Sequence, residues 1–264
     1  MELSRADYSV VVQGNVEVHR VESAIYDFIH EEIWNRTEQK RLRLALKSAI
    51  GLIDSNQFEA LDFGAGTGNV TKKLLGLGFR VTAVDISPEM CNVLIVNNKD
   101  DVASRRLSVL NVNIDTAKMS GQYDLVTCYS VLHHLPDYLL TLRVLARLTK
   151  KGGVLFIDHE RTPVSLAKGI VEKVIVKGYY FVNNTLENAY LRLHGVKVPN
   201  IDYSKSDVNL SIRWSSVIDV LKREGFTTRL TRYYACETRY ETPLNILHKL
   251  IVNRSNIMLI AKKC

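Results

Sequence analysis

The segment from Ala60 to Val70 reads ALDFGAGTGNV and decides the fold. An apolar run leads into Asp62, and Gly64, Gly66 and Gly68 follow shortly after it. Glycine lets the backbone turn sharply and approach a ligand closely, and a helix that starts after such a turn presents free N–H groups. The segment therefore predicts a strand, a ligand-binding turn and a helix, which together open a parallel α/β unit.

The same alternation continues on the C-terminal side of this unit. Short apolar runs predict strands at 60–63, 81–84, 107–112, 125–129 and 153–158, and amphipathic stretches predict crossover helices at 70–77, 88–98 and 137–149. A helix at 214–224 that Gly225 ends, and strands at 226–234 and 256–262, complete the pattern. We expect a doubly wound, mostly parallel, seven-stranded α/β sheet of the Rossmann-like type.

The remaining segments divide the chain into four predicted regions. Residues 1–50 form an N-terminal helical cap with two helices within 24–50, the second starting near Thr37. Residues 51–160 form the ligand-binding core, and 161–210, richer in Lys, Tyr and Asn, form a lid inserted after the fifth strand. Residues 211–264 complete the α/β core.

Composition sets the class of protein. The chain has 264 residues, of which 46% are hydrophobic and 24% charged, values typical of globular proteins. The N-terminus does not resemble a secretory signal, and the four scattered cysteines favour reduced thiols, so we expect a soluble cytoplasmic protein. The net charge of +7 favours anionic partners, and no cysteine or histidine spacing predicts a metal site.

The spacing of the glycines distinguishes two kinds of cofactor. A dinucleotide fingerprint needs G-x-G-x-x-G, but position 69 is Asn69, so a nicotinamide oxidoreductase is disfavoured. G-x-G-x-G with an acid two residues earlier resembles motif I of class I S-adenosylmethionine-dependent methyltransferases of the small-molecule type. The resemblance implies that Asp62, Gly64, Ala65 and Gly66 line the methionyl part of S-adenosylmethionine, with Asp62 holding the ammonium directly or through water, and that Thr67 and Gly68 also belong to the cofactor site.

The ends of the next two strands carry the candidate adenosine contacts. Asp85 can accept hydrogen bonds from both ribose hydroxyls, and Ile86 can pack on the adenine. The family usually has an acid after the third strand. Here the sequence is NVNID, and we favour Asn113 and Ile114 for the adenine, with Asp115 as the rival.

The segment QYDLVTCYSVLHHLPD, 122–137, resembles the stretch that closes the cofactor site in the family. It places Tyr129 and Ser130 at the carboxyl edge of the sheet. A general base for the acceptor is sought among three histidines: His134 first, because the family often has a histidine there, then His133, and then His159 beside Glu160. In relatives a tyrosine helix often closes over the cofactor, which makes Tyr26 a further candidate.

The expected activity is in-line transfer of a methyl group from S-adenosylmethionine to a small or lipid- or quinone-like acceptor. Two alternatives stay open: an RNA methyltransferase, although the fourth strand lacks an Asn/Asp-Pro-Pro-aromatic signature, and a cofactor-binding regulatory protein without catalysis. In the lid, an apolar stripe bordered by lysines predicts either packing onto the core or contact with an anionic membrane surface. The stripe comprises Val164, Ala167, Val171, Val174 and Ile175, and the lysines are Lys168, Lys173 and Lys177.

Overall fold

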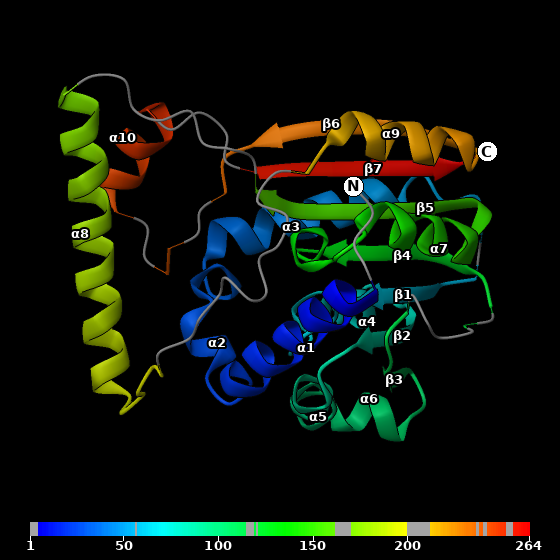
Figure 1. Ribbon diagram of the computed structural model, residues 1–264, viewed down its shortest axis with the longest axis horizontal. Coiled ribbons are helices and arrows are strands. Elements are labelled where there is room, and N and C mark those ends of the chain that lie inside the picture. Colours follow the sequence, from blue (N-terminus) through cyan, green and yellow to red (C-terminus); the bar gives the residue numbers. More distant parts are fainter. Residues whose placement is uncertain are drawn as a thin grey trace.

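The computed structural model describes residues 5–55, 57–114, 119, 121–161, 170–199, 212–235, 238–239, 242–251 and 256–264. Its strands are β1 (Glu59–Phe63), β2 (Arg80–Asp85), β3 (Leu107–Asn111), β4 (Tyr123–Tyr129), β5 (Thr149–Arg161), β6 (Phe226–Tyr233) and β7 (Asn256–Lys263). They form one sheet in the order β3-β2-β1-β4-β5-β7-β6, in which β7 alone runs antiparallel to its neighbours (Figure 1). The predicted seven-stranded, mostly parallel fold is confirmed.

Helices cover both faces of the sheet, and each face has its own apolar core. Successive side chains of β1 point to opposite faces of the sheet, so Leu61 belongs to one core and Ala60 to the other. The first core contains α7 (Tyr138–Leu148) and α9 (Trp214–Arg223), and the second contains α3 (Arg36–Ile50), α4 (Asn69–Gly76) and α5 (Pro88–Asn97). These two cores hold the strand ends rigidly, and the candidate site is built on those ends.

Local signals explain most helix boundaries. Ser87 caps α5 by accepting a hydrogen bond from the N–H of Met90 at 3.3 Å, and Pro88 follows at the first helical position. Gly225, with φ of +83°, follows the end of α9 as predicted. Helix α3 begins at Arg36, slightly before the predicted start near Thr37, because Asn35 is the cap and accepts from the N–H of Glu38 at 2.9 Å.

Other elements differ from the prediction. The helices α1 (Arg5–Glu22), α6 (Lys99–Ala103) and α10 (Pro243–Ile251) were not predicted. Strand β5 is longer than 153–158, because pairing with β4 continues back to Thr149 and pairing with β7 continues to Arg161. Pairing partners from distant segments set these ends, and periodicity within one segment does not reveal them.

The elements beyond the carboxyl ends of the parallel strands form the rest of the molecule. They are α1, α2 (Tyr26–Ile29), η1 (Glu31–Ile33), η2 (Leu132–His134), α8 (Ile170–Leu193) and α10. Figure 1 shows α8 and α10 at the far left, where they pack against each other. Within the described ranges, no helix is both long and apolar enough to cross a bilayer.

Candidate active site

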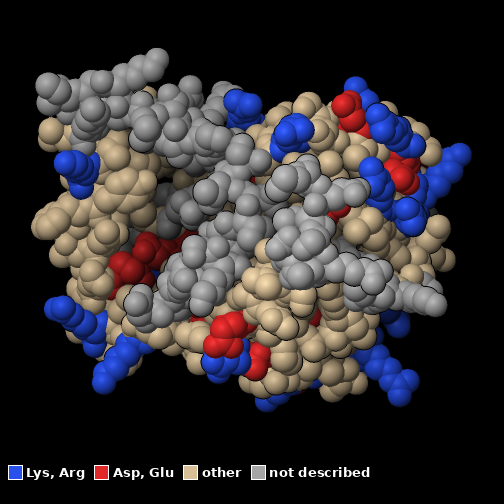
Figure 2. All heavy atoms as spheres, in the orientation of Figure 1, with Lys and Arg blue, Asp and Glu red and all other residues tan. Residues whose placement is uncertain are grey.

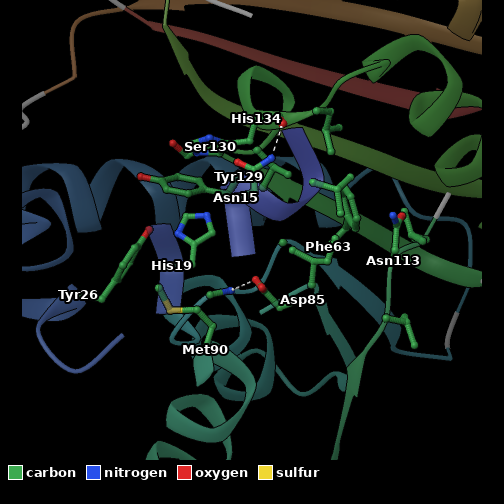
Figure 3. A pocket seen from close by; sticks show the side chains of 18 of the residues that line it. Asn15, His19, Tyr26, Phe63, Asp85, Met90, Asn113, Tyr129, Ser130 and His134 are labelled. Carbon is green, nitrogen blue, oxygen red and sulfur yellow. Dashed lines mark hydrogen bonds between the residues drawn. The ribbon is translucent and has the colours of Figure 1, made fainter. Parts of the chain in front are cut away.

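Two adjoining cavities lie over the carboxyl ends of β1 and β4. Both are lined by Tyr26, Gly64, Gly66, Tyr129 and Ser130. The strand order reverses between these two strands, and open α/β sheets place their ligands at such a switch point. Helix α1 closes the larger cavity from the opposite side (Figure 3).

The glycine-rich loop forms the floor that the cavities share. A Cβ at Gly64 would lie 2.3 Å from Cγ2 of Val131, so this position excludes any side chain. A Cβ at Gly66 would meet no atom within 4 Å, and φ there is +54°. Because Gly66 lines both cavities, a side chain at this position would fill ligand space. Gly68 differs from the prediction, since it faces Leu94 of α5 and lines neither cavity.

The predicted adenosine contacts converge on the larger cavity. Asp85, Ile86, Asn113 and Ile114 all line it, together with Met90, which was not predicted. The Asp85 carboxylate accepts the Gly66 N–H at 2.8 Å (Figure 3) and thereby connects the end of β2 to the glycine loop. The predicted rival Asp115 lies outside the described residues.

Asp62 lines the smaller cavity, but its carboxylate is already engaged. Oδ2 accepts the hydroxyl of Thr71 at 2.6 Å, and Oδ1 accepts the hydroxyl of Thr127 at 2.7 Å. Burial raises the pKa of Asp62 to about 6, against the effect of these two hydrogen bonds. The side chain therefore fastens β1 to α4 and β4, and direct contact with an ammonium would compete with that role.

Thr67 and Ala65 also line the smaller cavity. The Thr67 hydroxyl donates to Oδ1 of Asp27 at 2.6 Å. Asp27 belongs to α2, which also carries Tyr26, so this bond joins the glycine loop to the N-terminal cap. Tyr26, the candidate for closing over the cofactor, lines both cavities, and its ring stacks on His30 at 3.8 Å between centroids.

The backbone is strained where β4 ends and near the end of β5. Ser130 and His159 have φ values of +58° and +61°, in the left-handed region that residues other than glycine rarely adopt. The ring of His159 stacks on Tyr129 at 4.9 Å, and its Nδ1 lies 3.7 Å from Glu38. His159 is only 4% exposed and lines neither cavity, so it lies beneath the site, although the sequence placed it facing the lid.

The two adjacent histidines have different environments. Nδ1 of His133 lies 2.9 Å from the buried carboxylate of Glu160, which also accepts the N–H groups of Val131 and Leu132. Burial alone would raise the pKa of Glu160, but these hydrogen bonds, that from His133 above all, lower it. Glu160 is therefore an anion that can hold the His133 ring with Nε2 directed away from it.

His134, the histidine favoured from the sequence, lines the larger cavity. Its ring contacts His19 edge-on at 5.5 Å, and its carbonyl accepts the Asn15 side chain at 2.8 Å (Figure 3). Both partners come from α1. The structure therefore gives His134 a place in the cavity wall and gives His133 a carboxylate partner.

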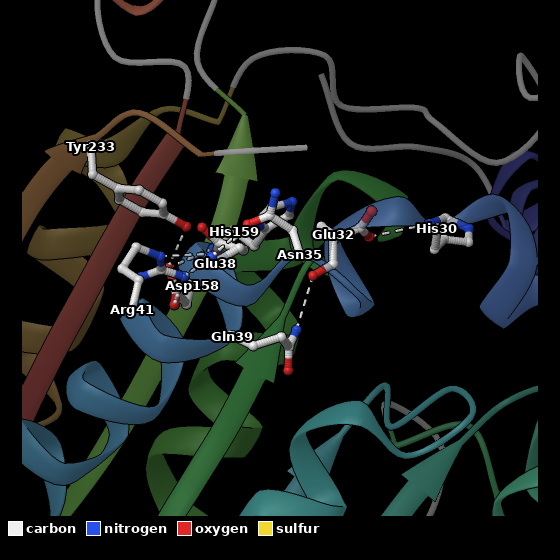
Figure 4. A network of polar contacts seen from close by, with 9 residues as sticks. All are labelled: His30, Glu32, Asn35, Glu38, Gln39, Arg41, Asp158, His159 and Tyr233. Atoms are coloured by element: carbon white, nitrogen blue, oxygen red, sulfur yellow. Dashed lines mark hydrogen bonds and ion pairs between the residues drawn. The ribbon is translucent and has the colours of Figure 1, made fainter. Parts of the chain in front are cut away.

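Several lining residues could not be inferred from the motifs. Tyr8, Val12, Asn15 and His19 come from α1, and Glu32 comes from η1. They lie far from the glycine loop in sequence and follow no recognisable spacing. The sequence also did not predict a polar network behind the site, which joins α3, β5 and β6. Its centre is Arg41, whose Nη2 donates to the carboxylates of Glu38 and Asp158 at 2.6 and 2.8 Å (Figure 4).

Comparison with known proteins supports the resemblance drawn from motif I. Residues 61–155 match the family model described as "Methyltransferase domain". The ubiquinone biosynthesis O-methyltransferase of Xanthomonas oryzae pv. oryzae is 36% identical over 112 residues, which are 42% of this chain and 47% of that protein. The match thus spans about half the length of that relative. Within this stretch the predicted similarity to methyltransferases is confirmed.

Solved structures show the same fold over nearly the whole chain. The DhpI–SAH complex aligns with a TM-score of 0.59 at 15% identity and covers 97% of this chain and 98% of that one. The [4+2]-cyclase SpnF aligns with a TM-score of 0.58 at 12% identity and covers 94% and 96%. At such low identities the likeness shows the fold alone.

Proposed function

We propose that this protein binds S-adenosylmethionine and transfers its methyl group to a hydroxyl of a small, quinone-like acceptor. The observation that carries the proposal is the arrangement around Gly66, where a side chain would enter open space between the two cavities. Asp85, which holds this loop, also lines the larger cavity. The O-methyltransferase name of the Xanthomonas oryzae relative supports a hydroxyl as the acceptor group.

The residues present fit the chemical groups of this cofactor. The larger cavity offers Asp85 to the ribose hydroxyls, and Ile86, Met90 and Ile114 to an adenine ring. The smaller cavity, between the glycine loop and the cap, suits the amino-acid part. When bound, the cofactor supplies a methyl group already activated on a sulfonium, so the protein has to position the reactants and exclude water.

The protein's own acid–base chemistry is assigned to His133, which lines neither cavity itself, but whose ring centroid lies 4.0 Å from that of His134 in the wall of the larger cavity. Glu160 accepts from Nδ1 of His133, which leaves Nε2 to take the proton of the acceptor hydroxyl. Tyr129 lines both cavities, and its buried hydroxyl has no hydrogen-bond partner within the described residues. A buried hydroxyl without a partner is costly, so we assign it to orienting the acceptor.

A quinone-like acceptor agrees better with the surface than a nucleic acid does. On the face shown in Figure 2, most coloured lysines and arginines lie singly near the rim, and those that gather at the upper right are interspersed with acidic residues, so they form no purely basic stripe. Nucleic-acid binding proteins instead gather such residues into a patch or stripe.

We also propose that α8 and α10 rest on an anionic membrane surface that supplies an apolar acceptor. Phe181 of α8 is 73% exposed and Leu250 of α10 is 77% exposed, and Lys177 and Lys249 on the same helices are exposed as well. Apolar side chains beside lysines are typical of interfacial helices. Of the predicted stripe, Val174 is exposed and Ile175 is half-buried. Val164, Ala167 and the bordering Lys168 lie outside the described residues, as do the side chains of Val171 and Lys173.

Two experiments test the proposed activity. Calorimetry measures binding of S-adenosylhomocysteine, and a transfer assay measures whether labelled methyl groups reach hydroxylated aromatic compounds. His133→Asn should lower kcat by about 100-fold or more and leave the affinity for S-adenosylhomocysteine unchanged. His194→Asn is the matched control, because His194 is an exposed histidine that follows the end of α8 and lines neither cavity. If the wild-type protein does not bind S-adenosylhomocysteine, the proposed activity is wrong.

Flotation with phosphatidylglycerol vesicles tests the membrane surface separately. Binding at physiological salt should weaken when Lys177 and Lys249 are changed to Gln, and it should be lost with Phe181→Ser. The exposed lysines Lys47 and Lys72 on the α/β core provide a control pair. If the wild-type protein does not float, the acceptor does not come from a membrane.

A further inference from the structure

We propose that Glu32, on the short helix η1 of the N-terminal cap, binds the ammonium group of the cofactor's amino-acid part. The inference rests on the proposed binding of S-adenosylmethionine and names a contact that no sequence motif indicates. It assigns recognition of the amino-acid part to the cap as well as to the glycine loop.

The position of Glu32 in the smaller cavity is the first argument. One wall of this cavity is the glycine loop with the start of α4, and the other contains Tyr26, Glu32 and Ile33 of the cap. Among the described residues that line it, the acids are Asp62 and Glu32. Both carboxylate oxygens of Asp62 accept threonine hydroxyls, as described above. Asp62 is also only 1% exposed, whereas the Glu32 side chain is 16% exposed, so Glu32 is the more accessible acid for a ligand.

The ionisation of Glu32 is the second argument. Its side chain is 16% exposed, and its Oε1 lies 3.3 Å from Nδ1 of His30 (Figure 4). Burial would raise the pKa of Glu32, but the hydrogen bond with His30 and the positive charges that His30 and His159 carry when protonated lower it to about 2. A carboxylate that stays ionised in a mostly enclosed cavity favours a cationic group, and a charge-assisted hydrogen bond satisfies it.

The chemistry of the two walls is the third argument. An α-amino acid carries a carboxylate and an ammonium on the same carbon. N–H groups of a glycine loop and of the first turn of a helix attract the carboxylate, and an acid on the opposite wall complements the ammonium. His30 holds Glu32 in place and stacks on Tyr26, which lines both cavities. Binding of the amino-acid part would thus keep the cap closed.

The test compares two ligands in the variant Glu32→Gln. S-adenosylhomocysteine carries the ammonium and 5′-methylthioadenosine lacks the whole amino-acid part. By calorimetry, the variant should bind S-adenosylhomocysteine about 10- to 100-fold more weakly, which is the scale of a lost hydrogen bond to a charged group, and methylthioadenosine as well as the wild type does. Deaminated S-adenosylhomocysteine, which keeps the carboxylate, should show no difference between variant and wild type.

Glu31→Gln is the matched control, because Glu31 is the preceding acid on the same short helix and accepts the Arg239 N–H instead of lining the cavity. It should leave the affinity for all three ligands unchanged. The proposal is overturned if Glu32→Gln binds S-adenosylhomocysteine normally, or if it weakens all three ligands equally. Failure of the wild type to bind S-adenosylhomocysteine would instead reject the cofactor itself.

Discussion

Two regions of the molecule border the site, and different interactions hold them in place. One is the carboxyl edge of the sheet, and the other is the N-terminal cap with the neighbouring helices α8 and α10. At the sheet edge, each contact comes directly after a strand: Gly64 and Gly66 after β1, Asp85 at the end of β2, Tyr129 at the end of β4. Main-chain hydrogen bonds between neighbouring strands fix these positions, such as Gly64 N–H to the Val84 carbonyl at 2.8 Å.

The cap and α8 are instead joined by side chains from distant parts of the sequence, and Arg239 is at the centre. Its guanidinium donates to both carboxylate oxygens of Glu187 on α8 at 3.1 Å, and to the carbonyl of Phe28 on α2. It also lies 3.9 Å above the ring of Tyr190. Its backbone N–H donates to Glu31 on η1. One residue thus connects the cap to α8.

The sheet-edge side of the site is therefore held rigidly by main-chain hydrogen bonds between strands, whereas the cap side depends on a few polar side-chain contacts. Local opening costs least where few apolar contacts and many polar contacts hold a segment. We therefore expect changes at the sheet edge to alter ligand binding while the fold persists. Changes in the cap and α8 should alter the stability of those segments first.

The largest effect is expected from Gly66→Val. The valine side chain would occupy ligand space at a left-handed backbone position, so affinity for S-adenosylhomocysteine should fall at least about 1,000-fold, or about 4.1 kcal/mol. Far-UV circular dichroism should stay native, because no atom lies within 4 Å of the new Cβ. Gly78→Val is the control, since Gly78 has φ of +93°, equal free space and no place in either cavity. Normal binding by Gly66→Val would contradict the assignment of the loop.

Arg239→Ala should have the next largest effect, on stability. It leaves the Glu187 carboxylate without its cation, and breaking a buried ion pair costs about 3 kcal/mol or more. Hydrogen exchange should rise in η1 and α8 while β1 and β4 stay protected. Arg239→Lys, which keeps the charge but loses the two-point contact, should lie between wild type and Arg239→Ala. Uniform loss of protection through the sheet would show that the two regions are not separate.

Asp85→Ala should weaken binding of S-adenosylmethionine by about 1.5 to 3 kcal/mol, the scale of lost hydrogen bonds to a charged group. Calorimetry measures the effect directly. Because Asp85 also accepts the N–H groups of Gly66 and Ser87, Asp85→Asn serves as the comparison that keeps one acceptor oxygen. Equal affinity of Asp85→Ala and wild type would remove the ribose contact.

The smallest effect concerns the pH dependence of stability through Glu31. Burial, with Glu187 adding to it, raises the pKa of Glu31 from 4.5 to about 7. The folded state then binds more protons than the unfolded state between these values, so the stability contributed below pH 4.5 is lost as the pH rises through 7. Glu31→Gln stays neutral, and its free energy of unfolding should vary less with pH over this window. Chemical denaturation at several pH values measures the difference, and an identical slope would refute it.

The sequence by itself determined the sheet and most of the cofactor side. Strands and crossover helices have local periodicity, and the glycine loop and Asp85 follow directly from strands that the pattern already located. Because the carboxyl ends of parallel strands meet at one edge, a linear pattern was enough to bring Asp62, Asp85, Asn113 and Tyr129 together.

Only the tertiary structure decided what each of these groups can do. Asp62 is committed to Thr71 and Thr127, and His133 is paired with Glu160, because side chains separated widely in sequence meet in the folded core. Glu32 and Asn15 reach the cavities on helices that carry no motif. Periodicity reports which face of an element is buried, but the partner of a polar group is fixed by packing between elements, and no local pattern encodes it.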